Sequence, residues 1–107
     1  MKYALLVYNA QPVSQLGARA EIAEVLARPT VTGWLRLQPV ESATTVSSPE
    51  GKTLLTDGPF VDSKEYLGGL IVVEAANLDE ALAVAAELQG WMSEGGALEV
   101  RPILEEG

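Results

Sequence analysis

Residues 66–75, with the sequence YLGGLIVVEA, are the most informative segment of the chain. They have the composition of a long strand, and the run Leu70 to Val73 places apolar side chains on both of its faces, as in the middle of a sheet. Gly68 and Gly69 permit a bulge or a close approach of a neighbouring backbone. The segment therefore predicts a central strand that is covered on both faces.

Two further strands lie at the ends of the sequence. Residues 2–8, KYALLVY, carry one apolar set at positions 3, 5 and 7 and a second at positions 4, 6 and 8, so this strand too must be covered on both faces. Residues Ala97 to Ile103 alternate Leu98 and Val100 with the charged Glu99 and Arg101. This last strand is expected to have one apolar and one polar face.

Helical signals follow the first strand and the central strand. Ser14 is placed to cap a helix that runs to about Ala27, and the Pro29–Pro39 stretch after it has no clear period, which predicts a loop with room for a short extended piece. The second helix is predicted from Leu78 to about Gln89, with a capping box at its start and Gly90 at its end.

A hairpin is predicted between the first helix and the central strand. Residues 43–48 and 52–56 have strand composition, and the Ser-Pro-Glu-Gly sequence at 48–51 supplies the turn. Asp57-Gly58-Pro59-Phe60 ends the second strand and begins a polar loop that extends to Glu65. We expect Phe60 to anchor this turn in the core.

The order of these elements is strand, helix, hairpin, strand, helix, strand, in one domain spanning residues 1–107. It predicts an α+β ferredoxin-like sandwich with an inserted hairpin, in which both helices lie on the same face of the sheet. Because two strands also carry apolar residues on the other face, a second copy is the economical cover, which predicts a homodimer.

Composition excludes several kinds of chemistry. The 107 residues include neither cysteine nor histidine, so disulfides, thiolate nucleophiles, imidazole bases and the commonest zinc ligands are missing. A net charge of -8 argues against nucleic-acid binding. No apolar run approaches the roughly 20 residues of a membrane helix, and the short apolar start does not continue as a signal peptide. A cytoplasmic protein without cofactor or metal is expected.

Several motifs together resemble the DGPF-domain family, a branch of the YCII-related proteins. They are Thr56-Asp57-Gly58-Pro59-Phe60, Ser63-Lys64-Glu65, Leu67-Gly68-Gly69, Met1-Lys2-Tyr3 with Leu5-Leu6 and Tyr8, Leu37-Gln38-Pro39 with Ala43-Thr44-Thr45-Val46, Leu78-Asp79-Glu80-Ala81, and Val100-Arg101-Pro102. The resemblance implies a dimeric α+β barrel in which two ferredoxin-like sheets face each other. It implies little about activity, although some genes of the family neighbour extracytoplasmic-function sigma factors, which suggests regulation. More distant YCII-like proteins have a proposed His-Asp pair, which this chain without histidine does not reproduce.

Asp57 is the first candidate site residue, as a general base or a ligand-binding carboxylate at a strand end. Ordinary turn chemistry explains the same Asp-Gly-Pro sequence. Lys64, Glu65 and Tyr66 follow in the next loop and would supply a cation, an acid and a phenol, unless this loop is simply solvated. Arg101 is a candidate anion ligand or the partner of an ion pair within the dimer.

Other residues bear on a pocket or a metal. Phe60 would flank a cleft beside Asp57, and Trp34 and Trp91 would line a pocket or pack in a core or interface. The carboxylates of Asp57, Asp62 and Glu65 lack the oxygen-ligand pattern of a calcium loop.

Three functions fit these observations. The first is a small-ligand-binding homodimer, possessing a cleft near the Asp57 turn and a regulatory role. The second is a cofactor-independent enzyme that acts on a small organic substrate and uses Asp57 or Glu65 as its acid-base group. The third is a protein-interaction module, which a large apolar patch left exposed by dimerisation would favour.

Overall fold

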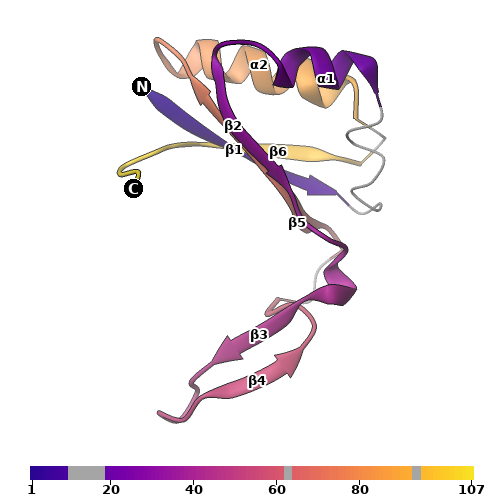
Figure 1. Ribbon diagram of the computed structural model, residues 1–107, viewed down its shortest axis with the longest axis vertical. Coiled ribbons are helices and arrows are strands. Elements are labelled where there is room, and N and C mark those ends of the chain that lie inside the picture. The colour runs from indigo at the N-terminus through magenta and orange to yellow at the C-terminus, as the bar shows by residue number, and fades with distance from the viewer. Residues whose placement is uncertain (10–18, 62–63, 93–94) are drawn as a thin grey trace.

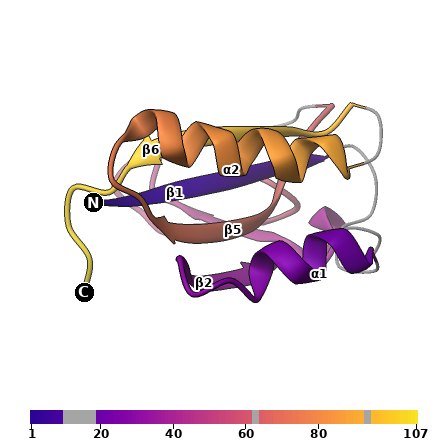
Figure 2. The same cartoon turned by 90° about the horizontal axis from the view of Figure 1, so that it is seen from above.

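A four-stranded antiparallel sheet forms the body of the protein, in the order β2-β5-β1-β6 (Figure 1). The computed structural model describes residues 1–9, 19–61, 64–92 and 95–107. The strands of this sheet are β1 (Lys2–Asn9), β2 (Val31–Arg36), β5 (Tyr66–Glu74) and β6 (Ala97–Pro102). The helices α1 (Ala20–Leu26) and α2 (Leu78–Gly90) lie together on one face, as Figure 2 shows. This arrangement is ferredoxin-like, as predicted.

The strand β2 is the main difference from the predicted elements. Its six residues occupy the edge of the sheet beside β5, where the sequence indicated mostly loop. The pairing shifts register between Val31 and Gly33, so the alternation of side chains is interrupted within the strand. A period of two is therefore not visible in the sequence.

The start of α1 also differs from the prediction. The helix begins at Ala20 after the extended Arg19 and ends at Leu26, one residue before the predicted limit at Ala27. Ser14, the predicted cap, lies outside the described residues. Ile22 and Val25 are the buried residues of this short helix, and they face the sheet.

The core lies between the sheet and the two helices. Leu5 and Val25 are fully buried, and fully burying an aliphatic side chain of this size contributes about 1.5–3 kcal/mol. From α2 come the buried Ala81, Ala85 and Leu88, at the three- and four-residue spacing of one helix face. Asn77 caps α2 by accepting a hydrogen bond from the Glu80 backbone N–H at 2.9 Å, as predicted.

Two glycines at the start of β5 have the predicted roles. The register of β1 against β5 shifts between Val7, opposite Gly69, and Tyr8, opposite Leu67, so Gly68 is the extra residue of a bulge. A Cβ on Gly69 would lie 2.9 Å from the carbonyl oxygen of Leu35 in β2. Only glycine permits this approach without movement of the backbone.

The hairpin forms a separate two-stranded sheet of β3 (Thr44–Ser47) and β4 (Leu54–Asp57), as predicted. It follows a single turn of 3-10 helix at Val40–Ser42. Figures 1 and 2 show the helices on one side of the main sheet and the hairpin extending away on the other. The expectation that Phe60 anchors the turn after β4 is wrong, because its side chain is 80% exposed.

Candidate functional site

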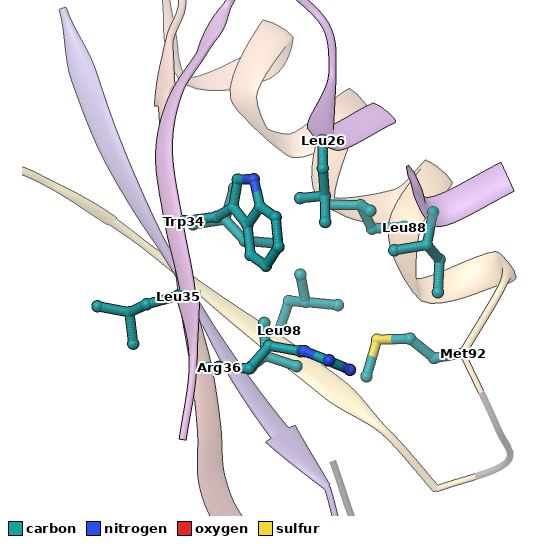
Figure 3. Close-up of a pocket in the computed structure, with 11 residues that line it drawn as sticks. Leu26, Trp34, Leu35, Arg36, Leu88, Met92 and Leu98 are labelled. Carbon is teal, nitrogen blue, oxygen red and sulfur yellow. The ribbon is translucent and has the colours of Figure 1, made fainter. Parts of the chain in front are cut away.

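A cleft opens between the helices and the covered face of the sheet (Figure 3). It is narrow, with an internal volume of only about 20 Å3, far below the roughly 300–1,000 Å3 of ordinary ligand pockets. Its walls come from the four strands of the main sheet, from α1 and α2, and from Met92, two residues after the end of α2. The lining residues are Val7, Ile22, Leu26, Trp34, Leu35, Arg36, Gly69, Ile71, Leu88, Met92 and Leu98.

The strand β2 forms one wall of the cleft. Trp34 pairs with Ile71 of the covered face and its ring extends over the cleft toward Leu26, whereas the side chain of Leu35 points to the opposite side of the strand (Figure 3). Arg36, two residues after Trp34, returns to the cleft side and points toward Met92. Gly69 pairs with Arg36 and adds no side chain, which lets the β2 backbone approach closely at this edge of the cleft.

The exposed lining of the cleft is apolar. The ring of Trp34 has the largest apolar surface of any lining side chain, and Trp34 is 51% exposed. Among the described lining residues, Arg36 is the sole ionisable one, and its aliphatic stem contributes apolar surface as well. Such a cleft is too narrow to enclose a ligand without movement of its walls, but its apolar mouth can contact a flat or slender apolar group, and the Arg36 side chain lies at one side.

Contacts near both ends of α1 join it to the last part of α2. At the first end, the Arg19 guanidinium lies 5.5 Å from the centroid of the Trp91 ring, within the range of a cation-π interaction. Just after the C-terminal end of α1, Arg28 donates hydrogen bonds to Glu24. It also donates to both carboxylate oxygens of Glu87, over 2.9 and 2.6 Å. These contacts help to fix the separation of the two helices and thereby the width of the cleft.

The Arg28 contacts shift two ionisation equilibria. Hydrogen bonds to Glu87 and Glu24 raise the pKa of the Arg28 guanidinium. Hydrogen bonds from Arg28, with its positive charge adding to them, lower the pKa of Glu87. Arg28 and Glu87 are therefore both charged at neutral pH.

The predicted site at the Asp57 turn has a different character. Asp57 pairs with Thr44 at the end of β4 and is exposed. Gly58 has a φ of 98°, its N–H donates to the Ala43 carbonyl at 2.8 Å, and its carbonyl accepts from the Thr45 hydroxyl at 2.8 Å. The turn is thus held by its glycine and by hydrogen bonds between backbone and threonine.

A second, open groove lies beside this turn, where the hairpin leaves the main sheet. Its lining residues are Leu37, Gln38, Pro39, Val40, Ser42, Ala43, Pro59, Tyr66 and Leu67. The structure brings Tyr66 into this groove with Pro59 of the predicted site. Asp57 and Phe60 are not among the lining residues, and Lys64 and Glu65 are exposed just before β5.

Arg101 lies apart from both cavities. It is on the uncovered face of β6, 69% exposed, with its Nε 3.7 Å from a carboxylate oxygen of Glu99. Both charged side chains lie on the face opposite Leu98 and Val100, and the observed ion pair lies within one chain. The candidate carboxylate Asp62 lies outside the described residues, and no metal-binding group of three acidic residues occurs among those that are described.

Sequence reasoning considered Trp34 as a pocket residue but did not single out Arg36 or Met92. Trp34 and Arg36 are two residues apart in β2 and therefore lie on the same side of the strand. This spacing is a signal that the sequence contains. Met92 follows α2 and reaches the cleft only through the packing of that helix, which local sequence does not show.

Comparison with known proteins agrees with this fold and its motifs. The family model of the YCII-related domain matches residues 1–106. The chain belongs to the YCII-related family. An uncharacterized protein, R00369, of Rhizobium meliloti (strain 1021) is 34% identical over 114 residues, which cover 96% of this chain and 92% of that protein. The resemblance read from the DGPF motifs is confirmed at the level of the family.

Among the described residues, no helix of this YCII-related chain is long and apolar enough to cross a membrane.

Proposed function

We propose that this YCII-related protein binds a small, largely apolar molecule at the mouth of the cleft beneath α1 and α2, and that it works as a homodimer. The observation that carries the ligand proposal is the apolar cleft beside the half-exposed ring of Trp34. An exposed tryptophan at the mouth of an apolar cleft provides a large stacking surface for a planar group.

Binding is favoured over acid-base catalysis by the chemistry of the lining. None of its described members is a carboxylate, a phenol or a lysine, the side chains that usually serve as acid-base groups when histidine and cysteine are absent. An enzyme would have to use a group from elsewhere, such as Asp57 in the hairpin. A non-catalytic role that senses or carries a ligand, including regulation, requires only the cleft.

The homodimer is supported by the uncovered face of the sheet. Leu6 of β1 pairs with Leu70 of β5, and Leu70 pairs with Leu35 of β2, so three leucines form a row across this face. Beside them lies the pair Ala4 and Val72. An apolar row of this kind on a sheet is typically buried, and a two-fold axis would bury the same row of both copies.

The ligand proposal is tested with the fluorescence of Trp34. In a Trp91→Phe background Trp34 is the single tryptophan, and titration with benzyl alcohol or benzoate is expected to change its emission in a saturable way below about 1 mM. Leu26→Phe fills the cleft and should abolish this change. Leu82→Phe adds the same ring at an exposed position of α2 and should leave it intact.

Either of two results would contradict the ligand proposal: no saturable response to these probes, or an undiminished response in Leu26→Phe. Benzoate binding more tightly than benzyl alcohol would show that Arg36 takes part, because only benzoate carries a negative charge.

Asp57→Asn separates the remaining site hypotheses. If Asp57 binds the probes or acts as an acid-base group, the variant loses binding or turnover with little change in melting temperature. If the cleft is the site, the variant keeps the Trp34 response. Isothermal titration of both proteins with the same probes distinguishes these outcomes.

A further inference from the structure

We infer that the β3–β4 hairpin is an arm that packs on the second copy of the chain. The inference rests on the proposed homodimer and adds to it a segment that each copy contributes to the other. The arm is defined as residues 44–47 and 54–57 with the turn between them.

The arm extends from the body instead of folding onto it. A compact chain of this length has a radius of gyration of about 13 Å. The observed value is 15.3 Å, and the longest dimension of the molecule is 44 Å. In Figures 1 and 2 the arm and the helices lie on opposite sides of the main sheet, so the arm projects on the side of the uncovered face.

The surface of the arm is unusually apolar for an isolated hairpin. Val46 and Leu55 pair across the two strands on one face, and each is 67% exposed. Leu54 on the other face is 50% exposed, and Phe60 and Val61 just beyond β4 are 80% and 63% exposed. A two-stranded hairpin alone is marginally stable in water at best. Burial of Val46 and Leu55 against another surface would stabilise it.

A second copy of the chain offers a surface large enough to bury these side chains. The uncovered face presents, by strand register, Lys2, Ala4, Leu6, Tyr8, Leu35, Leu70, Val72, Glu74, Ala97, Glu99 and Arg101. With the four residues of β3 and the four of β4, this surface approaches the roughly 20–30 residues per side of a stable protein interface.

The charges of the uncovered face also suit self-association. The row Leu35, Leu70, Leu6 is apolar in the centre of the sheet, and Glu99 and Arg101 follow at the β6 edge. Charged groups of both signs at the rim can face their opposites across a two-fold axis, although the chain as a whole carries a net charge of -8.

The arm and the uncovered face lie on the same side of one molecule, so a two-fold axis through that side lets each arm reach the other copy. The partner's body then covers the apolar pair Val46 and Leu55, and the two arms enclose the interface from both ends.

The first test compares two variants of the arm by sedimentation velocity over a range of concentrations. Leu55→Glu is expected to raise the dissociation constant of the dimer at least about tenfold, because it puts a charge in the centre of the buried arm. The control, Thr56→Glu, places the same charge one residue later on the opposite face of the arm and should change it by less than about threefold.

The second test locates the arm, and the absence of native cysteine allows single labels. Lys52→Cys in the turn of the arm carries a spin label, and these molecules are mixed with unlabelled, 15N-enriched protein. Intermolecular broadening is expected for partner residues along the uncovered face or its edges. A label at Ala86→Cys, on the exposed side of α2, should leave that face unaffected.

The outcomes separate this inference from the dimer itself. A wild-type protein that stays monomeric at about 100 μM, well above the dissociation constant of an ordinary dimer, contradicts both proposals. A wild-type dimer that Leu55→Glu leaves unchanged, or whose arm label broadens no signal of the partner's sheet, contradicts the arm and leaves the dimer standing. Stable binding of a different protein in place of the second copy would likewise overturn it.

Discussion

The two faces of the main sheet carry similar residues and differ in what covers them. On β1, Leu5 is fully buried under the helices, whereas its neighbour Leu6 on the other face is only partly buried by adjacent side chains. The same contrast recurs on β5 between Val73 and Val72. Within the described residues, no helix packs on the face that contains Leu6 and Val72.

Apolar side chains on one face of a strand indicate that this face is buried, but they do not show which element or partner buries it. One face is covered by the chain's own helices, and its residues stabilise the monomer. The proposed cover of the other face is a second copy, whose contribution depends on protein concentration. Substitutions on the two faces should therefore differ in concentration dependence even when they remove the same side chain.

The largest effect on stability is expected for Leu5→Ala. Removing a buried leucine leaves a cavity, and the free energy of unfolding should fall by about 3 kcal/mol at every protein concentration. Leu6→Ala is the matched control on the neighbouring residue of the other face. Urea unfolding at two concentrations, about 2 and 100 μM, should show a smaller loss for Leu6→Ala that grows when the dimer is populated. Equal, concentration-independent losses would remove the distinction between the faces.

A second large effect is expected for Leu70→Glu, which puts a charge in the centre of the uncovered face. The dissociation constant of the proposed dimer should increase about 100-fold, equivalent to about 2.7 kcal/mol, because the carboxylate would have to be desolvated. Circular dichroism should show that the monomer remains folded. Ala86→Glu on the exposed side of α2 is the control for added charge. A Leu70→Glu protein that dimerises like the wild type would contradict burial of this face.

Much of the fold could be predicted from local sequence, because strands and caps are local patterns. The apolar alternation of β1, the cap at Asn77 and the glycines of β5 all agree with the structure. The strand β2 was hidden because its register shift breaks the period, and Phe60 was misplaced because composition does not show whether a turn lies against a core or projects from it.

The candidate site was harder to predict than the fold. The cleft forms where two helices meet the four strands of the main sheet, and its residues are spread from Val7 to Leu98. Its chemistry is apolar, so none of its residues resembles a catalytic motif. The sequence favours a ligand site at Asp57-Gly58-Pro59-Phe60. In the structure this segment lies at the end of the hairpin, at the edge of a separate open groove. The role of Asp57 in binding stays a prediction.

A smaller effect is expected at the helix that covers the first face. Asn77→Ala removes the side chain that accepts the Glu80 N–H, and the free energy of unfolding should fall by about 1 kcal/mol. Asn77→Asp preserves the acceptor and should restore most of the loss. The effect should be the same at high and low protein concentration, because the cap acts within one chain. Thermal unfolding of the three proteins tests it, and an unchanged midpoint in Asn77→Ala would contradict a stabilising cap.

The smallest effect is expected from the ion pair between Arg28 and Glu87, which joins the two helices over the covered face. Because Arg28 lowers the pKa of Glu87 below its ordinary value of 4.5, the carboxylate stabilises the folded state at pH values above about 4.5. That contribution should be lost as the pH falls through the lowered pKa and Glu87 becomes protonated. Both side chains are partly exposed, at 33% for Arg28 and 40% for Glu87, so the contribution is expected to be smaller than that of the Asn77 cap.

Melting temperatures of wild type and Glu87→Gln should therefore differ at pH 7 and converge toward pH 3, and added salt should reduce the difference at pH 7. Glu50→Gln in the hairpin turn also removes one negative charge, at a position distant in sequence from this network, and serves as the control. If Glu87→Gln also weakens the response of Trp34 to benzyl alcohol at pH 7, the ion pair contributes to the shape of the cleft as well as to stability. A difference that stays constant from pH 7 to pH 3 would show that packing of the Glu87 side chain, rather than its charge, joins α1 to α2.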